Sequence, residues 1–507
     1  MTDQRVSRGS AGPGADVAEF GYTQAMRRGT RSFASFAVAF AFVSIATGIF
    51  TTYGAVLQSS GPAGIWTWPV AVVGQLMVAL LFGSLAARIP VTGYSYQWVS
   101  RLANPVLGWI MGWISFTFLA IVVVAVDYTI ASTVLPVLLN YTGTPGNAWW
   151  VTAVVLAGQA LLVAFSTRWT ERVNNVAVTA ELVGMLLLVV LLLAVGAIMR
   201  GLDFSNLVST GSISHEGYFS FGSLLHVGPW MMGTLLGSFT IVGFESAANL
   251  AEETEQPARV VPRAMAQAVI ASGVLGFAFL IAVTLLAGDP VALAQSATPI
   301  ADVIARVLGP VVGTALLIMV VVAIFACGMV ILMTGVRLVW AMSRDARFPG
   351  HALWSRISPR FGTPLAATGL VFVLGELLLA IFAFQTDALF ALFSAATLLP
   401  SVIYAATVLL YIVKRRDLPP SKGFTLGPFE VPVIVLASIW LIFELLIFRD
   451  ISFLSSWVYV AIMVAIGAVY LGWLLASRGG TAGLAMPDMH SVDAELEADA
   501  AKAGARG

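Results

Sequence analysis

Long apolar stretches alternate with short polar loops over most of this 507-residue chain. A helix needs about 20 mainly apolar residues to cross a bilayer. Twelve stretches meet that length, and we predict that each forms a membrane-spanning helix. In chain order these spans lie near residues 33–58, 66–87, 106–135, 149–166, 174–199, 231–250, 264–287, 312–336, 364–383, 388–412, 431–448 and 454–476. The pattern therefore predicts an all-α polytopic membrane protein.

Glycine and small polar residues interrupt the first and sixth predicted spans near their middles, at residues 44–50 and 240–246. At bilayer depth a broken helix is tolerated only where its freed backbone groups face protein or a water-filled cavity. A matching pair of broken helices, one in each half of a chain, points to the substrate site of a secondary transporter. From these matched breaks alone we predict an inverted repeat of spans 1–5 and 6–10, followed by two additional spans.

Composition supports a membrane location and excludes several other classes of protein. The chain is 59% hydrophobic and only 10% charged, whereas a soluble domain carries roughly 25% charged residues. Its net charge of zero excludes a basic nucleic-acid-binding surface. Cys327 is the only cysteine and lies in an apolar run, so neither a disulfide framework nor a thiol metal site is expected. We expect Cys327 to be a small core residue.

The positions of lysine and arginine predict the orientation. Residues 1–30 are polar and contain no signal-peptide core, and residues 479–507 are small and polar, so we expect two cytoplasmic tails around a transmembrane domain at 31–478. With this orientation, cytoplasmic tails and loops contain all but three of the 26 Lys and Arg residues, the exceptions being Arg200, Arg306 and Arg449. The positive-inside rule favours this arrangement, in the cytoplasmic membrane of the cell.

Four segments resemble the amino acid–polyamine–organocation superfamily of permeases, in particular its amino acid/choline branch. The matching segments are residues 44–64, 88–98, 243–254 and 337–349. The resemblance implies a 5+5 inverted repeat of the LeuT type, with helices 1 and 6 broken and extra helices appended. It also implies import or exchange of amino acids and amines. One departure is Ala86, where many relatives carry a glutamate, so an internal gating pair built on that glutamate is not expected.

The first break provides a candidate site for the carboxylate of a substrate. Ala46, Thr47 and Gly48, followed by Ile49, match the small-residue stretch that lines the substrate carboxylate in the permeases that this chain resembles. Unpaired N–H groups at the start of a half-helix hold an anionic group, aided by the positive end of the helix dipole. We therefore expect these residues to bind substrate.

The second break provides a candidate site for the amine of a substrate. Carbonyl groups freed near Phe239, Thr240 and Val242 would accept hydrogen bonds from a substrate ammonium group, with Gly243 forming the break. Phe239 is either an aromatic lid over the substrate or a core- or lipid-facing residue. Gly243 and Gly48 alternatively serve close helix packing. Their occurrence together, in corresponding spans, favours the substrate site.

Carboxylates inside predicted spans are candidates for coupling, because a charge at mid-span costs about 2.5–3.5 kcal/mol on insertion scales. Glu245 follows the second break, and the resemblance places it on a glutamate implicated in coupling or gating; its alternative role is to cap unwound backbone. Glu181 in span 5 either carries a proton or binds a cation. Asp127 in span 3 pairs either with a substrate amine or with another helix. Glu376 and Glu444 are expected to be structural.

The sequence contains none of the common hydrolase or nucleotide-binding motifs, so no enzyme activity, cofactor or metal site is expected. Span 8 offers no mid-depth pair of hydroxyl groups to replace the water of a sodium ion. We therefore predict a secondary active transporter that imports an amino acid or related amine with protons and without sodium.

Two alternatives to this function stay open: an obligate exchanger of amino acids or amines and, more remotely, a membrane sensor without net transport. The expected partners are a small-molecule substrate, protons and the lipid bilayer, but no nucleic acid. The sequence does not identify the amino acid or amine, the pocket residues on spans 3, 8 and 10, or the oligomeric state.

Overall fold

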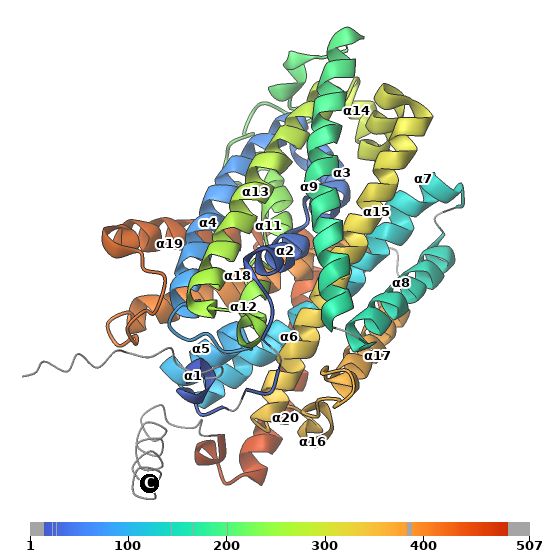
Figure 1. Ribbon diagram of the computed structural model, residues 1–507. Helices are drawn as coiled ribbons and strands as arrows, with labels where there is room; N and C mark the ends of the chain where they lie inside the picture. Colours follow the sequence, from blue (N-terminus) through green and yellow to red (C-terminus); the bar gives the residue numbers. More distant parts are fainter. Residues whose placement is uncertain are drawn as a thin grey trace, which may run out of the picture.

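The apolar stretches fold into long helices that lie side by side (Figure 1). The computed structural model describes residues 15–22, 24–26, 28–142, 144–165, 167–199, 201–382 and 388–484. Across these ranges, the bridge between Thr30 and Thr254 is the only β-type pairing. The prediction of an all-α fold is therefore confirmed.

The first half of the chain contains the helices that correspond to predicted spans 1–5. In chain order its α-helices are α1 (Ala15–Ala18), α2 (Ser32–Val43), α3 (Ile45–Ser60), α4 (Thr67–Ala86), α5 (Tyr94–Leu102), α6 (Pro105–Thr129), α7 (Leu135–Leu139), α8 (Pro145–Phe165) and α9 (Thr167–Ile198). A π-helical turn, Ile130–Val134, joins α6 to α7.

The second half begins with the short helices of predicted span 6. Its α-helices are α10 (Pro229–Gly233), α11 (Leu235–Thr240), α12 (Ser246–Asn249), α13 (Pro257–Leu285), α14 (Pro290–Leu293), α15 (Pro299–Arg344), α16 (His351–Trp354), α17 (Leu365–Phe382), α18 (Ala388–Lys414), α19 (Glu430–Ile447) and α20 (Leu454–Ser477). Helix α15 is kinked at Gly309, where φ is 74° and a proline follows.

Ten helices in the described ranges are long and apolar enough to cross a membrane, compared with the twelve predicted spans. Predicted span 6 is not among the ten because it is divided into short helices, the longest of which has six residues. Predicted span 9 corresponds to the shorter apolar helix Leu365–Ile381, and residues 383–387 of the chain lie outside the described ranges. Both predicted interruptions, in spans 1 and 6, are present.

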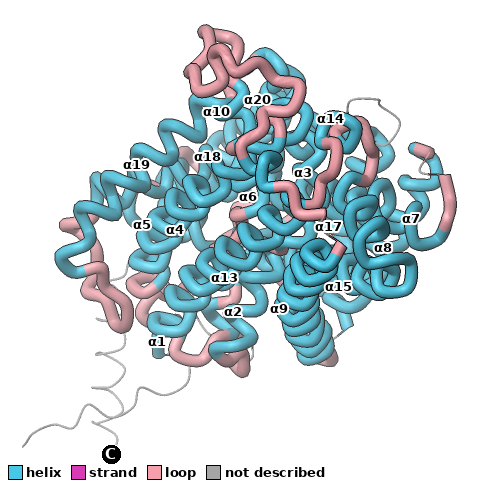
Figure 2. The backbone as a smooth tube through the Cα atoms, turned by 90° about the horizontal axis from the view of Figure 1, so that it is seen from above, coloured by secondary structure: helices cyan, strands magenta, loops and turns pink. Residues whose placement is uncertain are grey.

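The helices form two packed groups (Figures 1 and 2). In the first group, α13 packs against α2 and α4, and α11 packs against α3 and α4. In the second group, α15 packs against α6 and α8, and α17 also contacts α6 and α8. Helix α9 contacts both groups through α2 and α15. Both broken helices therefore belong to the first group, next to the second.

The two ends of the helical assembly differ in charge. One end, with α1, α5 and α16, lies at the bottom of Figure 1. Arg101 belongs to α5, and Arg356 lies just after α16. We call this end the basic end. The opposite end contains α14 and the long loop before α10. The described N-terminal segment lies at the basic end, where α1 is labelled in Figure 1.

Candidate functional site

The first break is a single residue wide. Helix α2 ends at Val43 and α3 begins at Ile45. Between them Ser44 has φ of 33° and ψ of 100°, a backbone conformation that residues with side chains rarely adopt. The predicted break over residues 44–50 is thus narrower than expected, and the candidate residues 46–49 form the first turn of α3, all buried.

The amide groups at the start of α3 are already paired, contrary to the expectation that they await a substrate carboxylate. The Glu181 carboxylate accepts hydrogen bonds from the Ala46 amide and the Ser44 hydroxyl through the same oxygen, both at 3.1 Å. The Ser44 oxygen accepts from the Thr47 amide at 3.3 Å. Because α9 packs against α2, Glu181 reaches the break and supplies an anionic group at the positive end of α3.

The second break extends over the residues between α11 and α12. Gly243 has a positive φ of 84°, and its amide donates to the Tyr404 hydroxyl at 3.0 Å. That hydroxyl donates in turn to the buried Glu245 carboxylate at 2.7 Å. Within the described part of the chain, no hydrogen bond reaches the carbonyl oxygens of Thr240 or Val242. Glu245 therefore supports the unwound backbone through Tyr404, while acceptors at the break stay open.

The two broken helices touch each other at two glycines, Gly48 in the first turn of α3 and Gly243 at the second break. A Cβ atom added to Gly48 would lie 2.1 Å from the Thr240 hydroxyl oxygen, and one added to Gly243 would lie 1.7 Å from the ring of Phe42. Glycine at each position thus permits close contact with the other broken helix. Candidate residues about 195 positions apart in the sequence therefore lie next to each other in the structure. This proximity agrees both with glycines that serve close helix packing and with glycines that form a substrate site.

Asp127 and Cys327 lie beside the first break but outside it. Asp127 is fully buried, and its carboxylate accepts from the Gln159 side chain at 2.7 Å; it therefore pairs with another helix, one of its two predicted roles. Its other oxygen has no hydrogen-bond partner among the residues that the structure describes. The Cys327 thiol donates to the Phe42 carbonyl at 3.4 Å, close to the break. Sequence reasoning missed this contact, because an isolated cysteine in an apolar run carries no signal for it.

A small cavity adjoins the second break. Phe239, the residue before Thr240, lines a cavity of about 80 Å³ together with residues of α3 and α18. Its ring packs edge-on against Phe393, with ring centroids 5.2 Å apart. Hydroxyl groups on the lining include those of Thr51 and Thr397. Phe239 therefore faces the protein interior, one position away from the open carbonyl of Thr240.

Glu444 lies nearer to the second break than its position in span 11 suggested. Its carboxylate is fully buried and accepts from the Gln75 side chain at 3.2 Å. The hydroxyl of Ser238, adjacent to Phe239 in α11, lies beside the same carboxylate. Because α19 packs against α4 next to α11, a residue expected to be structural contacts the broken helix.

Two ion pairs join α15 to the segment after the second break, one buried and one partly buried. The Arg337 guanidinium and Glu253 lie 2.9 Å apart, and Arg344 and Glu252 lie 3.0 Å apart. The Arg337–Glu253 pair is almost fully buried, with 3% and 4% of the side chains exposed. These acids belong to the permease-like segment 243–254, but the sequence did not identify their partners.

The N-terminal segment is held against these ion pairs. The Tyr22 hydroxyl donates to Asp345 at 2.9 Å, and burial together with the Asp345 charge raises the pKa of Tyr22 to about 12. Tyr22 is therefore protonated and able to donate at neutral pH. The amides of Gly29 and Thr30 both donate to the Glu253 carbonyl at 3.0 Å. The basic end is thus closed by side-chain pairs and by backbone contacts.

The candidate residues offer hydrogen-bonding groups and charge. Within the described ranges, no three His, Cys, Asp or Glu side chains gather closely enough to hold a metal ion. Open carbonyls, a carboxylate at a half-helix start and an adjoining cavity instead suit a small molecule with an ammonium group.

Comparison with known proteins identifies relatives over most of the chain. The family model described as amino acid permease matches residues 32–475. The chain is similar to the amino-acid permease BAT1 of Arabidopsis thaliana, with 26% identity over 84% of this chain and 86% of that protein. It is similar to the GABA-specific permease of Saccharomyces cerevisiae, with 24% identity over 82% of this chain and 75% of that protein. A putative polyamine transporter of Candida albicans is 22% identical over 82% of this chain and 76% of that protein.

Proposed function

Because this chain belongs to the amino acid permease family, within the amino acid–polyamine–organocation superfamily, we propose that it is a secondary active transporter that imports an amino acid or related amine. It is a multi-pass membrane protein, and its family and relatives are permeases rather than enzymes. The names of its relatives refer to amino acids, GABA and polyamines, which all carry an amine.

The proposed architecture has twelve spans, ten of them in an inverted repeat. Equivalent helix contacts support the repeat. In an inverted repeat, span 3 (α6) corresponds to span 8 (α15), and span 5 (α9) corresponds to span 10 (α18). The contact of α15 with α9 is then equivalent to the contact of α6 with α18, and both contacts are present. In the same way, α15 contacts α8 as α6 contacts α17. The positive-inside rule supports a cytoplasmic location for the basic end, with both termini on that side of the cell membrane.

The observation that carries the proposal is the meeting of the two breaks. Gly48, in the first turn of α3, contacts Thr240 at the end of α11, and the Thr240 and Val242 carbonyls accept no hydrogen bond from any described residue. Carbonyl groups at a break coordinate cations in transporters with discontinuous helices. The substrate ammonium group therefore binds at these carbonyls, with Phe239 packing over it from the adjoining cavity.

Glu181 links the binding of a proton to the binding of substrate. The negatively charged Glu181 carboxylate lies at the start of α3, where it accepts hydrogen bonds from the Ala46 amide and the Ser44 hydroxyl. Charge-assisted hydrogen bonds are roughly twice as strong as neutral ones, so protonation of Glu181 weakens its hold on these donors. The donors then become available to the carboxylate of a substrate, which prefers the same positive helix end. Proton and substrate thus enter together.

Sodium is not the coupling ion in this proposal. A cation that sheds its water needs several replacement oxygens, such as backbone carbonyls. At the first break, the Phe42 carbonyl already accepts a hydrogen bond from the Cys327 thiol. The neighbours of Cys327 in α15 are Ala326 and Gly328, which carry no side-chain oxygen. A single titratable carboxyl group is sufficient for a proton.

The test is uptake of radiolabelled amino acids and γ-aminobutyrate into proteoliposomes that contain the purified protein. We expect uptake with choline in place of sodium, and faster uptake at acidic external pH. A strict requirement for sodium would contradict the coupling proposal. Uptake only into vesicles preloaded with substrate would favour the obligate exchanger, and absence of uptake despite binding would favour the sensor.

A further inference from the structure

A pocket of about 550 Å³ opens at the basic end, between α16 and the last turns of α20, whose labels lie close together in Figure 1. Helix α20 belongs to the candidate span Ile451–Ser477, in which 17% of the most apolar stretch is buried. This is the lowest share among the ten candidate spans of the described ranges. A span that exposes so much apolar surface is surrounded by lipid, so the pocket lies next to the bilayer.

Most residues that line this pocket are apolar or aromatic. Leu353 of α16 and Trp473 of α20 both line it, and 46% and 60% of these residues are exposed. The Trp473 ring stacks on Tyr470, with ring centroids 5.5 Å apart. Tryptophan and tyrosine gather where a membrane meets water, with their rings at the level of the lipid headgroups. This wall therefore suits the glycerol and the first acyl carbons of a lipid.

The charged part of the same lining is basic. Arg356, Arg478 and His351 line the pocket, and none of its described lining residues is an aspartate or glutamate. Arg478 donates a hydrogen bond to the Ala346 carbonyl, and Arg356 donates one to the Ala352 carbonyl at 3.1 Å. Neither arginine forms an ion pair with a carboxylate in the described part of the chain. Because a guanidinium group has five N–H donors, both keep donors and positive charge for an anion.

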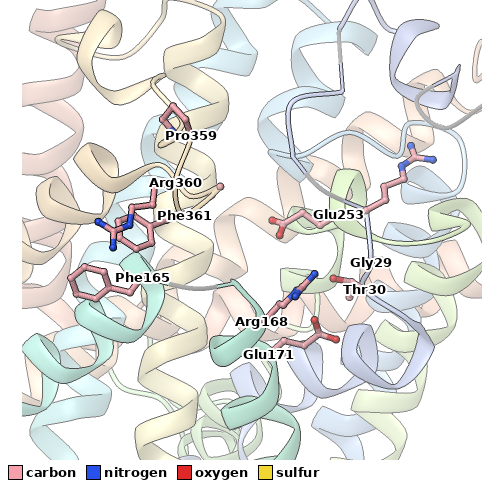
Figure 3. A pocket seen from close by; sticks show the side chains of 11 residues that line it. Gly29, Thr30, Phe165, Arg168, Glu171, Glu253, Pro359, Arg360 and Phe361 are labelled. Atoms are coloured by element: carbon pink, nitrogen blue, oxygen red, sulfur yellow. The ribbon is translucent and has the colours of Figure 1, made fainter.

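A second pocket at the basic end, of about 410 Å³, has a different distribution of charge (Figure 3). Its Arg168 lies on the same side as Glu171 and Glu253, and Arg360 lies on the far side. An anion beside Arg168 would therefore meet two carboxylates as well. The pocket between α16 and α20 combines basic and apolar residues without this repulsion.

We propose that the pocket between α16 and α20 binds an anionic phospholipid of the surrounding membrane. The lipid phosphate binds Arg356 and Arg478, and the glycerol and first acyl carbons lie along Leu353 and Trp473. Guanidinium groups bind phosphate through charge-assisted, often paired hydrogen bonds, and basic pockets beside membrane helices bind anionic headgroups. A soluble phosphate would leave the apolar wall in water, and a neutral lipid would leave the arginines without a counter-ion. The proposal depends on the membrane location of the chain and not on transport.

A bound headgroup would join two parts of the fold, because Arg356 lies just after α16 and Arg478 lies at the end of α20. A ligand that binds only the folded state stabilises it. Anionic lipid should therefore raise the melting temperature of the wild-type protein in nanodiscs, and this increase should be smaller in Arg356→Gln and Arg478→Gln.

A cysteine reporter tests the site directly. The native Cys327 is buried, so a cysteine introduced at the exposed pocket residue Ala352 is selectively labelled by N-ethylmaleimide. In phosphatidylcholine nanodiscs, replacing one fifth of the lipid by phosphatidylglycerol should slow the labelling of Ala352→Cys at least threefold. Pro359→Cys, at an exposed residue of the pocket in Figure 3, measures any general effect of the anionic lipid and should show no protection.

Substitution of the arginines then assigns the contacts. Adding Arg356→Gln or Arg478→Gln to the Ala352→Cys reporter should abolish protection by phosphatidylglycerol. Arg360→Gln, which changes an exposed arginine outside this pocket, should leave the protection intact. Native mass spectrometry should also detect one more retained phosphatidylglycerol on the wild type than on the Arg356→Gln and Arg478→Gln variants. Size-exclusion chromatography checks that each variant is folded.

Equal labelling rates in the two kinds of nanodisc, or protection that persists in both arginine variants, would overturn the proposal. Protection by millimolar glycerol 3-phosphate in phosphatidylcholine nanodiscs would assign the pocket to a soluble phosphate instead. Protection without anionic lipid, together with disulfide cross-linking of two Ala352→Cys chains, would assign it to a second copy of this chain. Protection without anionic lipid that is lost on neutralising Asp493, Glu495 and Glu497 would assign it to the acidic C-terminal segment of the chain. Because labelling does not require uptake, a failure of the proposed transport function leaves this test unaffected.

Discussion

Gly48 and Thr240 are in direct contact, although they lie on the two different broken helices. A Cβ atom at position 48 would be 2.1 Å from the Thr240 hydroxyl oxygen and 2.5 Å from its Cβ. The start of α3 and the end of α11 therefore cannot move past each other independently. This contact couples the proposed carboxylate end of the substrate site to its ammonium end.

Gly48→Ala should abolish high-affinity substrate binding, because its new methyl group overlaps the Thr240 side chain and forces the breaks apart. A shift of this kind changes the distance between the two ends of the site, and we expect affinity to fall at least tenfold. The measurement is equilibrium binding of the radiolabelled substrate to purified protein, with size-exclusion chromatography as the check on folding.

Two further variants separate close packing from a direct role of Gly48. Gly48→Ala combined with Thr240→Gly removes the overlap and should restore much of the affinity. Gly369→Ala in α17, where an added Cβ meets nothing within 4 Å, should behave like the wild type. Wild-type affinity in the single Gly48→Ala variant would contradict the contact.

Glu181→Gln should flatten the dependence of uptake on external pH. The glutamine carbonyl still accepts from the Ala46 amide but carries no charge and binds no proton, so the start of α3 is permanently in the neutral state. Uptake should then differ less than twofold between the two pH values. The comparison variant Glu245→Gln disrupts the Tyr404 contact at the second break and should slow uptake while preserving pH dependence. If Glu245→Gln flattened the pH dependence and Glu181→Gln preserved it, the coupling residue would be Glu245 instead of Glu181.

The substrate should need a charged or strongly polar amine. The open carbonyls of Thr240 and Val242 accept hydrogen bonds but supply no compensating cation. An N-acetylated analogue of the transported amino acid should therefore compete at least a hundredfold more weakly than the parent in the uptake assay. Equal competition by the two compounds would show that the polarity assigned to the site is wrong.

Asp450 should stabilise the folded protein in a pH-dependent way. Burial alone raises its pKa, but hydrogen bonds from the Ser452 and Val227 amides outweigh burial and lower the pKa below the usual value for aspartate. A depressed pKa in the folded state adds stability above the unfolded value of about 3.9, and this stability is lost as the pH falls through the folded pKa.

Asp450→Asn should lower the free energy of unfolding by about 1.5–3 kcal/mol at pH 7, the usual scale for a hydrogen bond to a charged group. The loss of melting temperature, measured in detergent, should shrink as the pH falls through the lowered folded pKa of Asp450, where the wild-type carboxylate itself becomes protonated. Asp417→Asn is the control, because that side chain is 68% exposed and no such loss is expected. A pH-independent effect of Asp450→Asn would contradict the assignment.

The breaks could be predicted from the sequence, but their internal pairing could not. Gly48 and Gly243 indicated the two interruptions in the sequence. A helix at bilayer depth is broken only where its freed backbone groups face protein or a water-filled cavity, so such interruptions are rare and recognisable. Which groups take up the freed donors depends on helices elsewhere in the chain. The Ala46 amide bonds to a carboxylate 135 residues away, and the Gly243 amide bonds to a hydroxyl 161 residues away.

The sequence by itself determined the apolar spans, the positions of the breaks, the charge asymmetry and the family resemblance. Each of these follows from local composition, because a bilayer requires every spanning segment to satisfy its own backbone and to exclude charge. Only the tertiary structure decided that Glu181 occupies the start of α3, that Cys327 caps the Phe42 carbonyl and that Arg337 pairs with Glu253. Side chains at such separations meet only through helix packing, which leaves no local pattern in the sequence.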